Sequence, residues 1–459
     1  MNAPIIRLFA LVLVLFGVLV AFTSRWTVFE AEALRENPNN RRVLFEEQRI
    51  KRGIIRAANG QVLAANRTLS GDRYARRYPT GQLFSHPIGF TSLDRGRIGL
   101  EEYYNDPLTG RRSDAIGALD RLFGPRDIGD DLQTTLSPEG QEAAYQGIGD
   151  RRGAVVALDV ETGAVLVLAA TPTFDPTKPE DAETFNRATQ GRFPPGSTMK
   201  VVTAAAALDS GDFTPDTQVD GENGKEISGT PLDNFGGEDF GQVSLADALT
   251  NSVNTAWATV AEELGKETMS EYMRRFGFYE DPPMDYPDEQ MLPSGEVNAR
   301  GRLLSPTSDQ VDVGRMAIGQ DKLLVTPLQM ATVAQTVANG GMRMEPRLVE
   351  KVVDPDGRTI DEPLPQEAER VMSEESANQL AAMMQTVVEQ GTGTSAQLEG
   401  VDVSGKTGTA EVGDGTDNLW FIGFTDRFAV AAMLERQTGG TGGANAAPIA
   451  AEVLKALGE

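Results

Sequence analysis

The chain has 459 residues, more than one hydrophobic core usually serves, so we expect two domains. The chain carries a net charge of −25: residues 25–112 hold 16 Lys and Arg against 10 Asp and Glu, whereas residues 113–459 hold 25 against 57. This acidic main body argues against nucleic acid as a partner. The sequence has no cysteine, which excludes disulfides, a thiol nucleophile and a zinc–thiolate site. We expect neither a metal nor a cofactor. The single histidine, His86, lies far along the sequence from the serine-containing motifs described below, and we interpret it as structural or on the surface. A hydrolytic or acyl-transfer site in this chain would therefore need a lysine or a carboxylate as its base.

The first 24 residues predict a membrane anchor. Residues 5–22 are apolar apart from Arg7, which makes a slightly short transmembrane helix, and Trp26 suits the far membrane interface. A cleaved signal peptide is the rival interpretation, but the stretch around Ala21 has no clean small-x-small cleavage site. With no second long apolar run, a signal-anchor over residues 1–24 predicts a single-pass cell-membrane protein whose catalytic part is extracytoplasmic.

Residues 25–150 are expected to form a small N-terminal pedestal domain. Residues 25–45 read as a polar helical stalk, and residues 48–55 and 61–64 as two strands joined by an Asn59-Gly60 turn. Residues 67–135 are mixed and rich in Gly and Arg, without a helical period, and predict irregular structure.

Residues 151–459 are expected to form one large α+β domain, an antiparallel sheet flanked by helices. Its expected strands cover residues 153–159, 164–170, 401–403, 406–411, 420–423 and 429–434. Its expected helices cover residues 197–208 and 447–457 and lie around residues 245–275 and 326–339.

The candidate nucleophile is Ser197, with Lys200 as its base. The pair lies at the predicted start of a helix behind Pro194-Pro195-Gly196, and positions i and i+3 share one helix face. Free backbone N–H groups at a helix start stabilise an oxyanion. Burial and a neighbouring cation would keep the lysine partly neutral, as a base must be. Ser-x-x-Lys alone is a weak signal.

Two further motifs strengthen this interpretation. Ser252 and Asn254, at the head of another predicted helix, offer a hydroxyl for proton relay and an amide for a substrate carbonyl. Lys406, on a predicted strand, offers positive charge, and Thr407 beside it offers a hydroxyl to a substrate carboxylate. Gly408 lets a substrate backbone lie against the strand edge.

The ordered triple Ser-x-x-Lys, Ser-x-Asn, Lys-Thr-Gly resembles that of the penicillin-binding transpeptidases and serine β-lactamases. Similar signatures extend over most of the chain. They comprise Phe193-Pro194-Pro195-Gly196, Ile318-Gly319-Gln320, Val325-Thr326-Pro327-Leu328-Gln329-Met330, Gly391-Thr392-Gly393-Thr394, Thr409-Ala410-Glu411 and Trp420-Phe421-Ile422-Gly423. Arg52-Gly53-Ile54 with Gly60 and Leu63-Ala64, and Gly99-Leu100-Glu101 with Tyr104, resemble class B penicillin-binding protein signatures, here of the short actinobacterial type. Asp417-Asn418-Leu419 departs from the less polar lead-in expected before Trp420.

The resemblance implies a peptidoglycan D,D-transpeptidase of cell-wall synthesis. Ser197 would attack the penultimate D-Ala carbonyl of a D-Ala-D-Ala stem peptide, and a second stem's amine would resolve the acyl-enzyme. The backbone N–H groups of Ser197 and Thr409 would form the oxyanion hole, and β-lactams would acylate Ser197. A membrane glycosyltransferase of the shape, elongation and division family is the implied partner; a role in cell division or in cell-shape elongation stays open.

Several alternative interpretations account for parts of the sequence. Gly400-x-x-x-x-Gly405-Lys406-Thr407 matches a phosphate-binding loop, but the residues that follow are not helical. A β-lactamase would need a carboxylate for deacylation that no recognisable motif supplies, and the space before residue 150 is too short for a glycosyltransferase domain. A D,D-carboxypeptidase and a non-catalytic scaffold of the wall-synthesis complex stay as alternatives.

Overall fold

The computed structural model describes residues 3–30, 47–111, 128–181 and 183–459. Helix α1 (Ala3–Ser24) runs into a π-helical turn, Arg25–Phe29. Within the described residues, Ala3–Thr27 is the one helix long and apolar enough to cross a membrane. Residues 25–30 of the expected stalk are described, and residues 31–45 lie outside the described residues.

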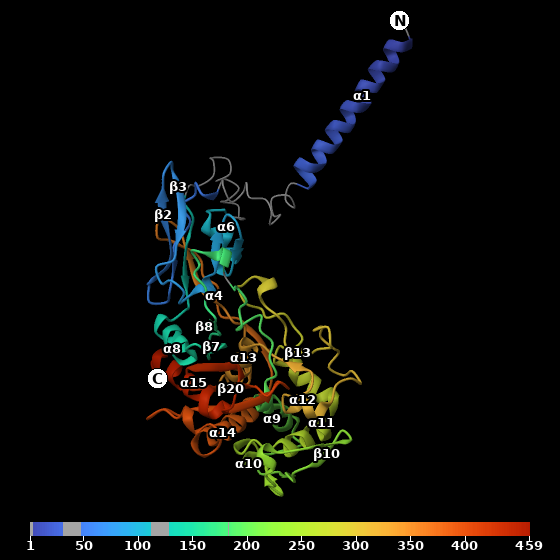
Figure 1. The fold of residues 1–459 in the computed structure, drawn as a ribbon, viewed down its shortest axis with the longest axis vertical. Helices are drawn as coiled ribbons and strands as arrows, with labels where there is room; N and C mark the ends of the chain where they lie inside the picture. The colour runs from blue at the N-terminus through green and yellow to red at the C-terminus, as the bar shows by residue number, and fades with distance from the viewer. Residues whose placement is uncertain (1–2, 31–46, 112–127, 182) are drawn as a thin grey trace.

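A six-stranded sheet forms the centre of the N-terminal region, in the order β17-β16-β6-β1-β2-β3 (Figure 1). The strands are β1 (Ile55–Arg56), β2 (Val62–Leu69), β3 (Arg73–Arg77), β6 (Asp131–Thr134), β16 (Val349–Val353) and β17 (Thr359–Asp361). The expected hairpin is present, with Gly60 at φ +85° in its turn, but its first strand is only two residues long. Strands β16 and β17 come from far along the chain, so two segments of sequence build this sheet.

The region expected to be irregular contains short, regular elements. After β3 come α4 (Ser85–Ile88), β4 (Phe90–Ser92), β5 (Gly96–Ile98), α5 (Leu100–Tyr103) and α6 (Asn105–Leu108). Elements of three to five residues are too short to show a helical or strand period in the sequence. Helix α8 (Pro138–Ile148) then leads into the second sheet.

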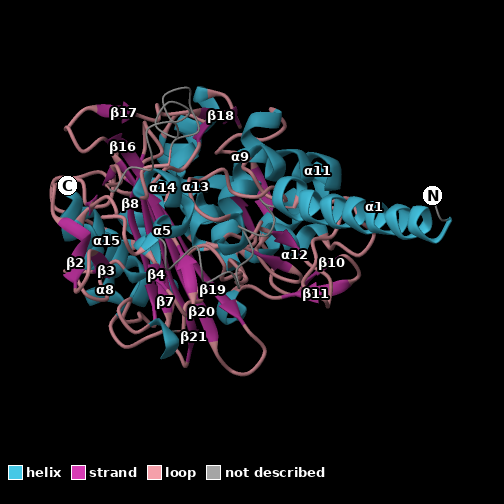
Figure 2. Ribbon diagram, turned by 90° about the horizontal axis from the view of Figure 1, so that it is seen from above, coloured by secondary structure: helices cyan, strands magenta, loops and turns pink. Residues whose placement is uncertain are grey.

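The second sheet has five antiparallel strands in the order β19-β20-β21-β7-β8 (Figure 2). They are β7 (Gly153–Asp159), β8 (Val165–Thr171), β19 (Ser404–Glu411), β20 (Asp417–Phe424) and β21 (Phe428–Gln437). Alternate residues of β7 enter two different cores: Val156 packs in the core that contains α13 (Pro327–Ala338), and Val155 packs in the core that contains α8 and α15 (Ala447–Leu457). Helices therefore cover both faces, as expected.

The helical part packs on the face of this sheet that carries α13. It consists of α9 (Lys200–Ser210), α10 (Leu245–Thr250), α11 (Asn254–Arg275), α12 (Val313–Ala317) and α14 (Glu374–Gln390). Two expectations were wrong: α14 was not anticipated, and residues 401–403 form no strand, since Val401 makes only an isolated bridge with Leu398. The polar lead-in before Trp420 fits the strand, because Asn418 is buried and its Oδ1 accepts from the Arg436 N–H.

Candidate active site

Ser197 lies in a 3-10 turn, Gly196–Met199, that leads directly into α9. Gly196 sets the entry to this turn with φ +54° and donates its N–H to Gly319 O at 3.0 Å. Gly319 has φ +77°, and a Cβ there would lie 2.0 Å from Gly196 O. The segment around Gly319 therefore supports the turn of the nucleophile by direct backbone contact, which only glycine permits.

The amine of Lys200 is fully buried beside Ser197. Its Nζ lies 3.0 Å from Ser197 Oγ, 3.2 Å from Ser252 Oγ, 2.7 Å from Ser252 O and 2.7 Å from Asn254 Oδ1. The carbonyl and amide oxygens can only accept, so they take two N–H groups of the amine. A neutral amine then keeps its lone pair for a hydroxyl, and the Ser197 hydroxyl is within reach. The geometry suits proton abstraction from Ser197.

A second buried amine reaches the same cluster. Lys406, 0% exposed, donates to Ser252 Oγ at 2.9 Å and to Thr407 O at 3.0 Å. Ser252 thus joins two amines, a chain that can pass a proton. Burial lowers the pKa of Lys200 well below its usual value, and the Lys406 charge lowers it further. Burial also lowers the pKa of Lys406, to about 7.

Ser252 and Asn254 reach the cluster from the start of α11. Ser252 adopts φ +58°, a left-handed conformation that turns the chain into the helix. Asn254 Nδ2 donates to Asp233 O at 3.0 Å, which fixes the amide so that Oδ1 faces Lys200. Buried Asn234 completes this support: its Oδ1 accepts from the N–H groups of Asn254 (2.9 Å) and Thr255 (3.1 Å).

Strand β19 lies at the edge of the five-stranded sheet, against the nucleophile turn. A Cβ on Gly408 would lie 2.7 Å from Pro195 O, so the glycine permits this close packing. The Thr407 hydroxyl bonds with that of Thr392 at 2.6 Å, and the Thr409 hydroxyl accepts from Gly442 N at 3.3 Å. The structure thus brings together the eight residues that the sequence singled out: they lie in the turn before α9, at the starts of α9 and α11 or just before them, and on β19.

Comparison with known proteins decides the family. A model described as the penicillin binding protein transpeptidase domain matches residues 153–455, and one described as the penicillin binding protein A dimerisation domain matches residues 52–123. The chain belongs to the penicillin-binding protein family. It is 34% identical to the peptidoglycan D,D-transpeptidase PbpA of Mycolicibacterium smegmatis, with 99% of each chain covered.

Solved structures of other penicillin-binding proteins have the same fold. A ceftriaxone acyl-enzyme complex of penicillin-binding protein A from M. tuberculosis matches with a TM-score of 0.80 and 31% identity, over 90% of this chain and 100% of that one. The D,D-transpeptidase domain of a peptidoglycan glycosyltransferase from Eggerthella lenta matches with a TM-score of 0.77 and 30% identity, over 89% of this chain and 98% of that one.

Two other sequence interpretations can be judged in this penicillin-binding protein. His86 is structural: it is buried, its Nε2 lies 3.0 Å from Pro172 O, and burial lowers its pKa to about 4. Lys406 and Thr407 belong to β19, with no helix after them, so the phosphate-loop geometry is not formed. Among the described residues, no group of three or more acidic or histidine side chains is placed to hold a metal ion.

Sequence reasoning missed Asn234 and Thr392 as supports of the site. Asn234 lies between Asp233 and Phe235 in a segment without helical or strand periodicity, so no local signal marks it. Thr392 had a signal, since it lies in the Gly391-Thr392-Gly393 segment, but nothing in the sequence shows that its hydroxyl meets that of Thr407.

Proposed function

We propose that this chain is a peptidoglycan D,D-transpeptidase in which Ser197 is the nucleophile and Lys200 its base. The observation that supports this best is the contact of 3.0 Å between Ser197 Oγ and a buried amine whose pKa is held low. Two obligate acceptors, Ser252 O and Asn254 Oδ1, orient that amine. A lysine in these surroundings is a base at neutral pH rather than a surface cation.

Acylation follows from the positions of the groups. Lys200 takes the Ser197 proton as Oγ attacks the penultimate D-Ala carbonyl of a stem peptide. The N–H groups of Ser197 and Thr409 stabilise the oxyanion, and the terminal carboxylate binds Lys406 and Thr407. The intermediate collapses as the C–N bond breaks, and the departing D-alanine amine receives a proton from Lys200 through the Ser252 hydroxyl.

Cross-linking reverses the proton movements. The amine of a second stem attacks the acyl carbonyl and gives its proton to the cluster of Lys200 and Ser252. Breakage of the ester returns a proton to Ser197 Oγ. Gly408 leaves room for the peptide backbone beside β19, and Asn254 binds a substrate amide. A β-lactam enters the same sequence at the first step and stays attached as the acyl-enzyme, which makes β-lactam antibiotics inhibitors of this protein.

The division of the chain that accompanies this function has three parts. Residues 1–24 anchor the protein in the cell membrane, residues 25–150 are the pedestal, and residues 151–459 are the transpeptidase domain, which lies outside the cytoplasm. Strands β16 and β17 belong by contact to the pedestal sheet, although they come from the third part. The partner is a membrane glycosyltransferase of the shape, elongation and division family, which supplies the glycan strands.

Labelling with a fluorescent penicillin tests the nucleophile. Wild-type protein should acquire one covalent label, and Ser197→Ala none, since the substitution removes the hydroxyl that lies 3.0 Å from Lys200 Nζ. Ser210→Ala, at the far end of α9, serves as a control and should label as the wild type does. Label retained by Ser197→Ala would overturn the assignment.

An assay with lipid-linked peptidoglycan precursor and a polymerase separates three outcomes. Cross-linked dimers of stem peptides support the transpeptidase. Release of D-alanine without dimers would show the D,D-carboxypeptidase alternative instead. Neither product, together with an unreactive Ser197, would show the non-catalytic scaffold.

A further inference from the structure

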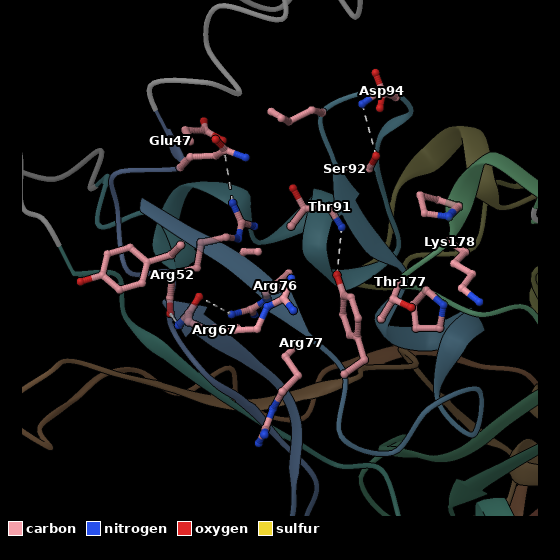
Figure 3. A pocket seen from close by; sticks show the side chains of 18 of the residues that line it. Glu47, Arg52, Arg67, Arg76, Arg77, Thr91, Ser92, Asp94, Thr177 and Lys178 are labelled. Carbon is pink, nitrogen blue, oxygen red and sulfur yellow. Dashed lines mark hydrogen bonds and ion pairs between the residues drawn. The ribbon is translucent and has the colours of Figure 1, made fainter. Parts of the chain in front are cut away.

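A cavity of about 680 Å³ opens in the pedestal region, and none of the proposed catalytic residues lines it (Figure 3). This volume is typical of a small-ligand pocket. Its walls come from five segments: residues 47–52, the middle of β2, most of β3, the turn after β4, and residues 176–180 after β8. Such a cavity, built from distant parts of the chain, needs an explanation that the transpeptidase reaction does not give.

The floor of the cavity contains two buried arginines that share one carboxylate. Arg52 Nη2 lies 3.0 Å from Glu101 Oε2, and Arg76 Nε contacts Glu101 Oε1. The side chain of Arg76 is 2% exposed, and its Nη2 has no hydrogen-bond partner among the described residues. A buried guanidinium N–H without a hydrogen-bond acceptor destabilises the fold, unless a ligand supplies the acceptor.

A second carboxylate does not balance the charge. Glu47 is shared by Arg52 at 3.9 Å, by Arg111 at 3.0 Å and by Arg97. Four arginines thus meet Glu101 and Glu47 in this part of the pedestal, and one of them, Arg111, also pairs with Asp106 at 3.8 Å. Burial is the main cause that lowers the pKa of Arg52; Arg76 and Arg97 lower it further, whereas Glu101 and Glu47 raise it.

The exposed walls add further cations. Arg67, Arg77 and Lys178 line the cavity, and no ion pair or side-chain hydrogen bond of theirs occurs in the described parts of the chain. Three acids, Glu47, Asp94 and Glu180, line the cavity against five cations, so cations exceed acids there. The long stems of the arginines and the lysine allow their heads to turn toward a bound anion.

The position along the chain brings the cavity near a membrane. Glu47 follows the candidate span, which ends at Thr27, by about 20 residues, a length that bridges at most about 70 Å when fully extended. Lipid headgroups are therefore within reach of residues 47–52, which form one wall.

From these observations we propose that the pedestal cavity binds a phosphate group, with the headgroup of an anionic membrane phospholipid as its source. Guanidinium groups match phosphate oxygens with paired N–H donors, and Arg76 Nη2 offers such a donor that has no partner in the described part of the chain. A bound headgroup fixes the pedestal at the membrane surface and thereby sets the height of the transpeptidase domain above it.

The test uses the full chain in neutral detergent micelles. Short-chain phosphatidylglycerol, short-chain phosphatidylcholine and inorganic pyrophosphate are titrated separately, and binding is measured by native mass spectrometry and by broadening of the ³¹P resonance. The cavity variant is Arg67→Ala/Arg77→Ala/Lys178→Ala. The matched control, Arg73→Ala/Arg300→Ala/Arg302→Ala, removes three exposed arginines that do not line the cavity. Labelling with fluorescent penicillin verifies that each variant is folded.

We expect the wild type to bind phosphatidylglycerol in preference to phosphatidylcholine. The cavity variant should weaken this binding by about tenfold or more, since each lost cation near an anionic headgroup has a sizeable effect, and the control should change it less than about twofold. Arg76→Lys, which keeps the charge but removes the unpaired donor, should also weaken it. Equal loss in the control variant, or unchanged binding in the cavity variant, would overturn the proposal. Tight binding of pyrophosphate without preference between the lipids would keep the phosphate site and reject the lipid as its source.

Discussion

Asn254 Oδ1 lies 2.7 Å from the buried amine of Lys200. The other end of the same amide donates to Asp233 O, so Oδ1 can only accept from the lysine. A neutral acceptor orients the amine without favouring its charged form as strongly as a carboxylate would. The choice of an amide rather than an acid at this position therefore helps Lys200 to act as a base.

The substitution Asn254→Asp tests this relationship. A carboxylate beside Lys200 should raise the pKa of its amine by about 1–3 units, which lowers the fraction of neutral amine at pH 7. We expect penicillin acylation to slow accordingly, and the acidic limb of its pH–rate profile to move to higher pH. Asn251→Asp, an exposed position three residues earlier, is the control and should leave the profile unchanged. A slow reaction with an unshifted pH profile would show that Asn254 acts by geometry alone.

The low pKa of buried Lys406 leads us to expect that the stability of the protein depends on pH. Burial lowers its folded pKa to about 7, against 10.5 when unfolded, so between these values the unfolded chain binds more protons. The free energy of unfolding should therefore rise as pH increases from 7 toward 10, by about 2–4 kcal/mol from this lysine. The buried Lys200 contributes in the same direction. In Lys406→Met the rise should be smaller, as measured by urea unfolding at pH 7 and pH 9.5.

The control for this experiment is Lys455→Met, which removes an exposed amine on α15. It should follow the wild-type profile. If Lys406→Met shows the same rise as the wild type, Lys406 is not the buried titrating group that its surroundings suggest.

Two glycines have nearly the same backbone conformation, so substituting each of them distinguishes the cost of lost close packing from the cost of backbone strain. Gly319 has φ +77° with Gly196 O in the position of its missing Cβ, whereas Gly211 has φ +80° at the end of α9 with no atom within 4 Å. Gly211→Ala should cost only about 1 kcal/mol, and Gly319→Ala clearly more, of the order of 3 kcal/mol or above. Gly319→Ala should also slow penicillin acylation, since it displaces the turn that holds Ser197. Equal effects of the two substitutions on acylation would contradict this role.

The chemistry of the site could be predicted from the sequence, but its supports could not. Ser197 and Lys200 are neighbours on one helix, so their contact follows from local geometry. Lys406 reaches the same cluster because β19 packs against the nucleophile turn. The order of the motifs indicated this packing only through the resemblance to a known family. Asn234 acts through a tertiary contact with the start of α11, and no periodicity predicts that. Short elements such as β5 and α5 were not predicted for the same reason: tertiary packing stabilises them, rather than a sequence pattern of their own.

Asn234→Ala measures the contribution of such a support. The substitution removes the acceptor for the N–H groups of Asn254 and Thr255 at the start of α11, and should cost about 1–2 kcal/mol of stability. Because Ser252 and Asn254 would lose their fixed position, acylation should slow by about tenfold. Asn298→Ala is the matched control: its Oδ1 also accepts from two backbone N–H groups, of Arg300 and Arg302, in another loop. A similar slowing in that variant would mean that the effect reflects general instability.

The pedestal offers a last test, at Glu101. This carboxylate is 0% exposed and binds both Arg52 and Arg76. Burial alone would raise its pKa, yet the two guanidiniums hold the pKa below its usual value. Glu101→Gln should therefore cost about 3–5 kcal/mol at pH 7, because two buried cations lose their counter-charge. The wild type should lose part of this advantage as pH falls below about 4.5, where the unfolded carboxylate takes up its proton.

The comparison for Glu101→Gln is Asp414→Asn, which breaks an exposed pair with Arg436. Solvent screens that pair, so no measurable change in stability is expected. The folded fraction of Glu101→Gln should still react with penicillin at the wild-type rate, since Glu101 contacts none of the groups around Ser197. A stability loss as small as that of Asp414→Asn would show that water reaches the arginines of the pedestal floor and compensates their charge. The excess of buried positive charge there would then be much weaker than the contacts imply.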